Sequence, residues 1–599
     1  MAPCLAFYIM PSHDLGHCGK STRQPSMAGS IQTSHISRSV RNAFLFLVLA
    51  MLVPRSGFAE LQSSTQGCPR PAAGATISNP PELRSHNGKL EVHLHLRFQQ
   101  TLVSEGPPRY CYVTDEGFDS PTLRVHPGDE LIIHLHNDLA PSAGNPVIKH
   151  EMNSMTRQDD CTGSTMDLST TNLHFHGMTI PPVCHQDEVI RTAIHAGGTF
   201  DYQVKIPEDE QPGLYWYHPH PHGFGERQVQ GGASGAIVVE GIENAIPSLA
   251  SYPQRVIVLR DQQRIGMEAP GPSVPTWDIS ANFVPVTYPE YVPAIIKARS
   301  GGREFWRLVN AAADTIFDLQ FVIDEVTQPI KIISIDGVVM DYPLQQTNLL
   351  LPPGARAEFV VTAPNKGETA QLITQMHDTG PSGDNDLKRP IANIVAVSNR
   401  SEGNARAVVR GRVHPASKPK LRYTAVVQRT LYFSQRSSNP QDPDNFVLYF
   451  LTVEGQKPEP YKMDSPPNIV VHQGDVEDWT IENRATEDHV FHVHQVHFKV
   501  LEVNGKAVHD PATRDTFDLP FWSGKGPYPS VKLRMDFSDP NAVGTFLYHC
   551  HILKHEDLGM MGSIQVLPRR DATTARTTAK PSPLQSSGRH VLDGASAQR

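Results

Sequence analysis

The densest group of reactive side chains in the sequence lies within residues 545–562, which read TFLYHCHILKHEDLGMMG. The first four of these residues are apolar, aromatic or β-branched, which is typical of a buried strand. Because side chains alternate between the two faces of a strand, His549 and His551 are expected to point one way and Cys550 the other. One strand end would then supply ligands to two metal centres, joined covalently through Cys550.

Cys550, His555 and Met560 have the residue types of one particular metal centre. A thiolate, an imidazole and a long axial thioether suit copper used for electron transfer, provided that a second imidazole completes the set. The alternative interpretation is a free cysteine in a histidine-rich strand. The spacing H-C-H-x3-H-x4-M holds five uncommon residues at fixed positions within twelve, and it favours the copper site.

The chain resembles the multicopper oxidases, a family that includes laccases, ascorbate oxidase, bilirubin oxidase and bacterial cuprous oxidases. Four motifs carry the resemblance over roughly residues 80–568, in the family's order: NLHFHG at 172–177, YHPH at 217–220, HVFHVH at 489–494 and the run at 549–560. Val490 and Gln495 stand where the family commonly has proline and glycine. Neither position is a ligand, so these departures leave the metal count unchanged.

The resemblance implies four copper ions and assigns their ligands. The type 1 copper ligands would be His489, Cys550, His555 and the axial Met560. The type 2 copper ligands would be His174 and His492. The type 3 pair would be held by His176, His218, His220, His494, His549 and His551. The type 2 and type 3 ions share one cluster, and its ligands come from both ends of the chain because neither end alone supplies enough imidazoles.

The implied activity is the four-electron reduction of O2 to water, coupled to four one-electron oxidations of a reductant. Electrons would leave the type 1 site through Cys550 and its two neighbouring histidines. A phenol or an aromatic amine is the expected reductant, as in laccases. The alternatives are a cuprous or other metal-ion oxidase serving metal tolerance and, in another class, a copper-binding or structural protein without turnover.

Two carboxylates are candidates for the proton route, because reducing O2 to water consumes protons at a site that excludes bulk solvent. Asp187 lies eleven residues after His176, where laccase-like relatives carry an acid, and Glu556 follows His555 directly. Carboxylates exchange protons with water near metal ions. The alternative for both residues is a solvated surface acid, which is where Asp and Glu usually occur.

Two other histidine pairs, His93–His95 and His134–His136, have the H-x-H spacing that places both side chains on one face of a strand. They match no ligand position of the family, and we expect them to be ordinary strand histidines. A loose group of methionines, Met152, Met155 and Met166, lies in a long polar stretch. Thioethers can bind cuprous ion, but packing within a loop is the expected role.

The elements that position these residues follow a three-fold repeat. Segments starting at Gly128, Gly301 and Gly474 each have a glycine turn, a strand and an asparagine nine positions after the glycine, at intervals of 173 residues. A further correspondence aligns residues 213–220, GLYWYHPH, with residues 544–551, GTFLYHCH. The chain of 599 residues, with 51 prolines and 43 glycines, is therefore expected to form several turn-rich β domains.

We expect an all-β fold of three consecutive cupredoxin-like Greek-key β-sandwiches, the architecture that the resemblance implies. Domain 1 should span residues 75–245, domain 2 residues 246–410 without copper ligands, and domain 3 residues 411–568 with the type 1 copper. Residues 569–599 have almost no apolar run and are expected to be a disordered tail.

The amino-terminal region, residues 1–59, is expected to contain a secretory signal. Two arginines precede the short apolar run 43–53, small residues follow it, and cleavage is expected near Ala59, with Met27 a possible true start. Eleven apolar residues are too few to span a bilayer. An exported, periplasmic or extracellular protein follows, without a transmembrane segment in its mature chain. The net charge is −9 with both signs mixed along the chain, so no nucleic-acid partner is expected. The expected partners are O2 and a small reductant or metal ion, and the protein is expected to be a monomer.

An exported protein can form disulfides, and four cysteines of the mature chain are free for this once Cys550 is assigned to metal. Four cysteines allow three connectivities. We favour Cys68–Cys111 and Cys161–Cys184 among the three.

Overall fold

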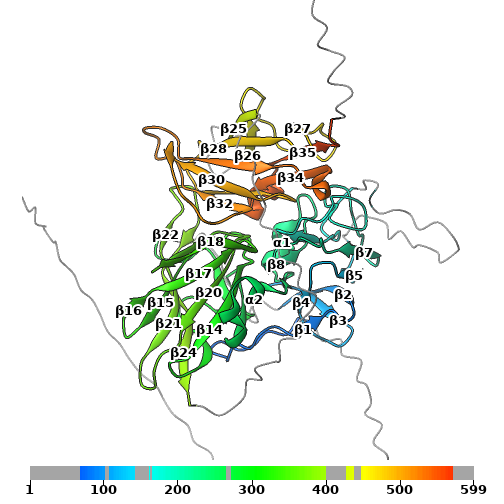
Figure 1. Ribbon diagram of the computed structural model, residues 1–599. Coiled ribbons are helices and arrows are strands. Elements are labelled where there is room, and N and C mark those ends of the chain that lie inside the picture. The colour runs from blue at the N-terminus through cyan, green and yellow to red at the C-terminus, as the bar shows by residue number, and fades with distance from the viewer. Residues whose placement is uncertain are drawn as a thin grey trace, which may run out of the picture. The chain divides into compact units, whose positions relative to one another are not determined.

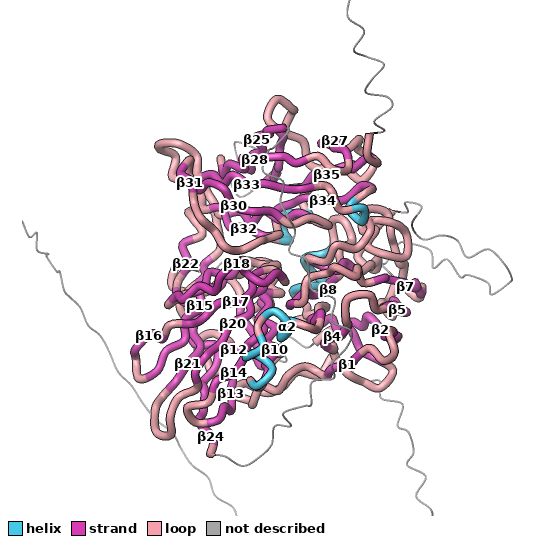
Figure 2. Tube along the Cα trace, viewed as in Figure 1, coloured by secondary structure: helices cyan, strands magenta, loops and turns pink. Residues whose placement is uncertain are grey.

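The computed structural model describes residues 68–101, 107–141, 161, 165–264, 271–398, 427–437 and 447–570. Strands make up nearly all of the regular structure, and the few helices are short (Figures 1 and 2). The all-β fold class is therefore confirmed. The expected signal region, its cleavage near Ala59, Met27, Met152, Met155 and the tail beyond residue 570 all lie outside the described residues.

The first stretch of the chain, from β1 to β9, forms two sheets around a common core. One sheet has the strand order β3-β2-β5-β7 and the other β1-β4-β9-β8-β6, drawn in blue to cyan-green in Figure 1. Side chains of both sheets meet in one buried cluster, which includes Leu94, Ile133 and Tyr217. The strands are β1 Glu82–Arg84, β2 Lys89–Gln99, β3 Arg109–Thr114, β4 Thr122–Val125, β5 Glu130–Asn137, β6 His174–His176, β7 Thr199–Lys205, β8 Gly213–His218 and β9 Gly235–Val239.

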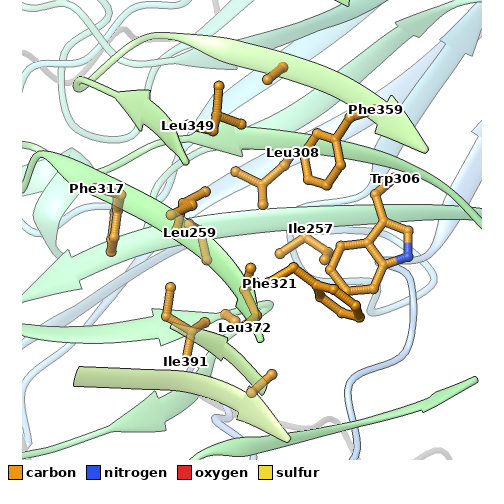
Figure 3. Close-up of a cluster of buried hydrophobic side chains, with 14 of the residues drawn as sticks. Ile257, Leu259, Trp306, Leu308, Phe317, Phe321, Leu349, Phe359, Leu372 and Ile391 are labelled. Atoms are coloured by element: carbon orange, nitrogen blue, oxygen red, sulfur yellow. The ribbon is translucent and has the colours of Figure 1, made fainter. Parts of the chain in front are cut away.

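The second, or middle, stretch runs from β10 to β24. Its two sheets have the strand orders β12-β11-β10-β14-β20-β17-β18 and β13-β24-β21-β15-β16, with β19 pairing β15. Aromatic and aliphatic side chains from both sheets, among them Trp306, Phe321 and Leu372, fill the space between them (Figure 3). The strands are β10 Gln254–Gln262, β11 Asp278–Ala281, β12 Val284–Val286, β13 Ala294–Arg299, β14 Arg303–Asn310, β15 Phe317–Ile323, β16 Val326–Gln328, β17 Ile330–Ile335, β18 Val338–Gln346, β19 Leu349–Leu351, β20 Arg356–Thr362, β21 Ala370–Gln375 and β24 Arg389–Val397.

The third stretch runs from β25 to β35. Its two sheets have the strand orders β26-β25-β28-β33-β30-β31 and β27-β35-β34-β29-β32. Its core includes Trp479, Phe491 and Tyr548, and it also encloses Cys550 and Met560. The strands are β25 Val427–Ser437, β26 Val447–Val453, β27 Ile469–His472, β28 Val476–Asn483, β29 His489–Val493, β30 Phe498–Val503, β31 Lys506–Ala507, β32 Thr516–Leu519, β33 Ser530–Asp536, β34 Gly544–Cys550 and β35 Met561–Leu567.

Short elements complete the described chain. The hairpin of β22 His377–Asp378 and β23 Asn385–Asp386 stands apart from the sheets of the second stretch. The helices are α1 Gly225–Gln230, α2 Ile242–Ala245, η2 Pro247–Ser251, η3 Pro540–Ala542 and α3 Leu553–Asp557. No helix among the described residues is long and apolar enough to cross a membrane. The domain limits proposed from the sequence stay a prediction.

The three repeat segments form equivalent strands, β5, β14 and β28. Each pairs in parallel with the first long strand of its own stretch, namely β2, β10 or β25. Each ends at a buried asparagine: the side-chain oxygens of Asn137, Asn310 and Asn483 accept hydrogen bonds from the backbone amide two residues later. Their amide nitrogens donate to carbonyls of the next loops. The repeated asparagine therefore fixes the loop that leaves each strand.

Among the described residues, disulfides join Cys68 to Cys111 and Cys161 to Cys184. This confirms the pairing favoured among the three possible ones. Cys550 is the free cysteine of the described residues, and it is buried.

Candidate metal centres

Eight buried histidines from the first and third stretches converge in one place. In the first stretch, β6 and β8 run antiparallel, with His174 opposite His218. In the third stretch, β29 and β34 do the same, with His492 opposite His549. The two strand pairs thus each present a short row of imidazoles. The buried histidines are His174, His176, His218, His220, His492, His494, His549 and His551.

The eight rings fall into groups whose nitrogens lie within 4.8 Å of one another. One group is His176, His218 and His551, and another is His220, His494 and His549. His174 and His492 form a third group with His176. Each group draws on both stretches, so neither stretch could hold its ions alone.

Hydrogen bonds at the outer nitrogens set the orientation of these rings. The Nδ1 atoms of His218 and His492 donate to the carbonyls of Pro219 and Asp515, at 3.0 and 2.9 Å. Their Nε2 atoms are buried and have no hydrogen-bond partner among the described residues. A ring held at one nitrogen with the other one bare is the usual state of a metal ligand. The donor set therefore fits metal ions.

Burial also favours, in several of these rings, the neutral form that binds metal. Burial first, and then the charges of neighbouring imidazoles, lower the pKa of His174 and of His494 well below the usual range. Burial lowers the pKa of His220 to about 4, against the opposing charge of Glu556. Neutral imidazole is the form that ligates metals.

A second centre lies on the opposite face of β34. His489 Nδ1 and His555 Nδ1 are 3.2 Å apart, and Cys550 Sγ lies 3.6 and 3.7 Å from them. Met560 is buried in the same core, and its backbone carbonyl accepts the amide hydrogen of Cys550. Thiol, two imidazoles and a buried thioether are the blue-copper donor set.

The protein environment of this second centre is dry. Burial lowers the pKa of His489 to about 3 and raises that of the Cys550 thiol. The ring of Tyr449 stacks on His555 with 4.1 Å between centroids, and that of Phe433 lies 4.9 Å from His489. A metal ion would therefore be needed to hold Cys550 as a thiolate.

The alternation expected along the strand is present. His549 and His551 belong to the histidine cluster, whereas Cys550 between them belongs to the second centre. The proposed ligands are thus brought together in the predicted groups, and their assignment to copper remains a proposal.

Asp187 is buried against the cluster. Its carboxylate lies 3.0 Å from His174 Nδ1 and accepts a hydrogen bond from the Phe175 amide. The side chain of Gln495 donates to its other oxygen. Burial raises the pKa of Asp187 well above the usual range. The interpretation as a solvated surface acid is therefore wrong for this residue.

Glu556 is buried at the other side of the cluster. Its carboxylate lies 3.0 Å from His549 Nδ1 and 3.4 Å from His220 Nε2. Burial opposes its ionisation, but the charges of His220, His549 and His218 and a hydrogen bond from His549 together lower the pKa of Glu556 to about 2. Both candidate relay residues therefore contact the cluster, and their role in proton transfer stays a proposal.

Two residues at the cluster were missed from the sequence, Asp515 and Arg356. Arg356 comes from β20 of the middle stretch and is fully buried. It donates two hydrogen bonds to the Asp515 carboxylate, at 2.7 and 2.6 Å. One oxygen of Asp515 lies 3.5 Å from His176 Nε2. Neither residue stands in a recognisable motif, so no sequence signal could have identified them.

The Arg356 side chain leaves room only for glycine in the first histidine motif. Gly177 has a left-handed backbone (φ 85°), and a Cβ atom there would lie 2.1 Å from the Arg356 guanidinium. A side chain at this position would displace the buried ion pair.

Three carboxylates whose charges act on Tyr449, the ring that stacks on His555, were also missed. Asp314 follows β14, Asp384 lies between β22 and β23, and Glu487 precedes β29. Glu487 lies 3.6 Å from His555 Nε2. Burial chiefly, and then the charges of all three carboxylates, raise the pKa of Tyr449. Glu487 therefore lies next to His555 itself, and the charges of Asp314 and Asp384 act on the Tyr449 ring that stacks on His555.

Of the three methionines in the loose group, only Met166 lies among the described residues. Its sulfur accepts a hydrogen bond from the His222 backbone amide. The two H-x-H pairs lie on β2 and β5, on a different sheet from β6 and β8.

Three family models described as multicopper oxidase match residues 164–244, 279–393 and 431–570, which together make up more than half of the chain. The chain is 24% identical over 495 residues to the multicopper oxidase mco of Staphylococcus haemolyticus, covering 81% of this chain and 88% of that protein. It is 21% identical over 504 residues to the iron transport multicopper oxidase FET3 of Gibberella zeae, covering 74% and 70%.

Solved structures share the fold. The multicopper oxidase of Campylobacter jejuni, described as a metallo-oxidase, matches with a TM-score of 0.62 and 22% identity, covering 83% of this chain and 96% of that chain. McoA of Aquifex aeolicus matches with a TM-score of 0.60 and 18% identity, covering 83% and 100%.

Proposed function

The chain belongs to the multicopper oxidase family, and from that membership we propose that it oxidises a reductant in four one-electron steps and reduces O2 to water. The observation that supports this most directly is the complete donor set: eight converging imidazoles and a separate Cys-His-His-Met centre. Copper ions bound there would supply the electron transfer and the reduction of O2. The complete set also argues against a structural protein without turnover.

The chain's own residues connect the two centres. Cys550 belongs to one centre, and its neighbours His549 and His551 belong to the other, so a path of covalent bonds joins them. Asp187 and Glu556 hold the rings of His174 and His549 from outside and are placed to exchange protons with the cluster. Burial of every one of these side chains excludes bulk water from the cluster.

We propose that the reductant is a hard divalent cation such as Fe2+ or Mn2+. Its site would be formed by Glu487, which lies beside His555, together with Asp314 and Asp384, whose charges act on the neighbouring Tyr449 ring. One oxygen of Glu487 is buried without a hydrogen-bond partner among the described residues. Carboxylates are preferred ligands of hard cations. Electrons would pass from the cation through Glu487 to the His555 ring, a gap of 3.6 Å.

The aromatic rings packed over the second centre also favour a cation as the reductant. His489 and His555 are both buried; Tyr449 stacks on His555, and the Phe433 ring lies tilted against His489. Among the described residues, this cover is neither a cleft open to the histidine rings nor a methionine lid. Two of the similar proteins are described as an iron transport multicopper oxidase and as a metallo-oxidase, names that refer to metals as well. A phenol or an aromatic amine remains the second candidate, because electrons could also pass through the ring of Tyr449.

Oxygen uptake by the copper-loaded protein separates these reductants. We expect Fe2+ in mildly acidic buffer to be oxidised faster than 2,6-dimethoxyphenol. Replacing Asp314 and Asp384 by asparagine should lower kcat/KM for Fe2+ at least tenfold and leave kcat/KM for the phenol within about twofold, because only the cation needs their charges.

The matched control is Glu325→Gln, which removes an exposed carboxylate from a turn of the same stretch. It should change neither rate. Rapid oxidation of the phenol with no catalysed oxidation of Fe2+ or Mn2+ would show that the laccase-like alternative is correct. No O2 uptake with any of these reductants, in protein that carries its full copper, would contradict the oxidase proposal itself.

We also propose that the protein is exported. Two disulfides tie the first stretch together, and disulfides persist in oxidising compartments. Amino-terminal sequencing of the mature protein should find a first residue near Glu60.

A further inference from the structure

The solvent-facing side of the sheet β3-β2-β5-β7 carries a block of four histidines. β2 and β5 are parallel neighbours, and their register places His93 opposite His134 and His95 opposite His136. Alternating residues of both strands, such as Leu94 and Leu135, point into the core, so the histidines point outward. The sequence showed two H-x-H pairs, and the register joins them into one block.

The four rings contact one another directly. His93 and His134 stack with 4.4 Å between centroids, and so do His95 and His136. The two stacks meet where His93 Nδ1 and His136 Nε2 lie 3.2 Å apart. A hydrogen bond between these nitrogens uses one proton, so one of the two rings must present a bare nitrogen there. The block therefore holds neutral imidazole at its centre.

Carboxylates flank both ends of the block. His134 lies 2.7 Å from Asp201 and 3.2 Å from Glu91. At the other end, His95 lies 2.9 Å from Asp138 and 3.0 Å from Asp115. These acids come from β2, β7 and the loops after β3 and β5. Arg97 and Lys89 pair with two of them, so the surroundings retain an excess of negative charge.

This combination favours a metal ion over isolated strand histidines. Imidazole is a preferred ligand of Cu2+, Ni2+ and Zn2+, and Cu2+ binds such sites most tightly of the divalent series. Histidines two residues apart on a strand are within reach of a single ion. Lying at the surface, their side chains can turn toward an ion without disturbing the core.

We propose that this histidine block binds one divalent transition-metal ion, Cu2+ most tightly, with His93 and His136 as the central ligands. The block belongs to a different sheet from β6 and β8, and the core that contains Leu131 and Tyr217 lies between the two sheets. The surface ion is thus additional to those of the buried centres.

Equilibrium dialysis of the fully copper-loaded protein against Cu2+ tests the proposal. The wild type should take up one further equivalent, and its electron paramagnetic resonance difference spectrum should show coupling to more than one nitrogen. The variant His93→Ala/His136→Ala should bind this equivalent at least tenfold more weakly. The variant His95→Ala/His134→Ala, which keeps the central pair, should lose less affinity.

The matched control is His126→Ala/His472→Ala, which removes two surface histidines that also lie beside acids but outside the block. It should bind Cu2+ like the wild type. Circular dichroism and O2 uptake should be the same in all variants, because none of these residues belongs to the buried centres. Equal Cu2+ uptake by the wild type and the His93→Ala/His136→Ala variant would overturn the proposal, as would a wild type that takes up no further equivalent.

Discussion

The side-chain amide of Gln495, in the third stretch, donates a hydrogen bond to the carboxylate of Asp187 in the first. Gln495 has a left-handed backbone (φ 54°), a conformation uncommon for a residue with a side chain. Many relatives carry glycine at this position, as the resemblance implies. Here the glutamine contributes a donor that crosslinks the two sides of the cluster, so the departure from the family pattern has a structural consequence at the cluster.

We predict that Asp187→Asn slows reoxidation of the copper-loaded protein by O2 at neutral pH. The amide keeps the shape of the side chain but cannot carry a proton from water to the cluster. Reduction of the Cys550 centre should keep its rate and the blue colour should remain. Stopped-flow absorbance, which follows reduction and reoxidation separately, measures both.

Glu556→Gln should have the same effect from the other side of the cluster, since Glu556 contacts His549 and His220. Gln495→Gly is the graded comparison: it removes the donor to Asp187 and leaves the carboxylate in place, so reoxidation should slow less than in Asp187→Asn. If Asp187→Asn and Glu556→Gln, each with full copper, turn over like the wild type across the pH range, neither residue is part of a proton route.

Cys550→Ser should abolish the blue colour and the oxidase activity and leave copper in the histidine cluster. The colour of such centres comes from the thiolate bond to copper, and serine lacks that ligand while it preserves the size of the side chain. Copper counting together with visible and electron paramagnetic resonance spectra checks the prediction. A blue Cys550→Ser protein would show that another residue is the thiolate ligand.

Arg356→Met should destabilise the protein and reduce copper occupancy of the histidine cluster. Asp515 would remain buried without its partner, and breaking a buried pair in this way costs about 3–5 kcal/mol. Burial opposes ionisation of Asp515, but the charge of Arg356 and the hydrogen bonds from His176, His492 and Arg356 together hold its pKa well below the usual range. Denaturant unfolding and metal analysis measure the two effects.

Arg307→Met is the control for that variant. Arg307 is also fully buried in the middle stretch, and it pairs with Glu358. Its loss should destabilise the protein to a similar degree but leave the copper content unchanged, because its partner Glu358 pairs with Arg307 and not with the cluster histidines. Equal copper loss in both variants would mean that Arg356 acts only through general stability.

The sequence was sufficient to predict the fold class and to group the candidate metal ligands. His549, Cys550 and His551 are neighbours in the chain, and the alternation of a strand separates their side chains whatever surrounds them. The repeated asparagines, Asn137, Asn310 and Asn483, also report local structure, because each contacts its own following loop. Features set by residues close together in the chain can be predicted from its pattern.

The residues around the centres depended on how the three stretches pack. Arg356 reaches Asp515 across 159 positions of the chain, and nothing near either residue marks the contact. Asp314, Asp384 and Glu487, whose charges all act on Tyr449, come from separate loops. The block of four histidines exists only in the register of β2 against β5. A shift of that register by one residue would turn one strand's histidines toward the core. Contacts of this kind depend on the free energy of packing the whole chain, so they cannot be predicted from a short stretch of sequence.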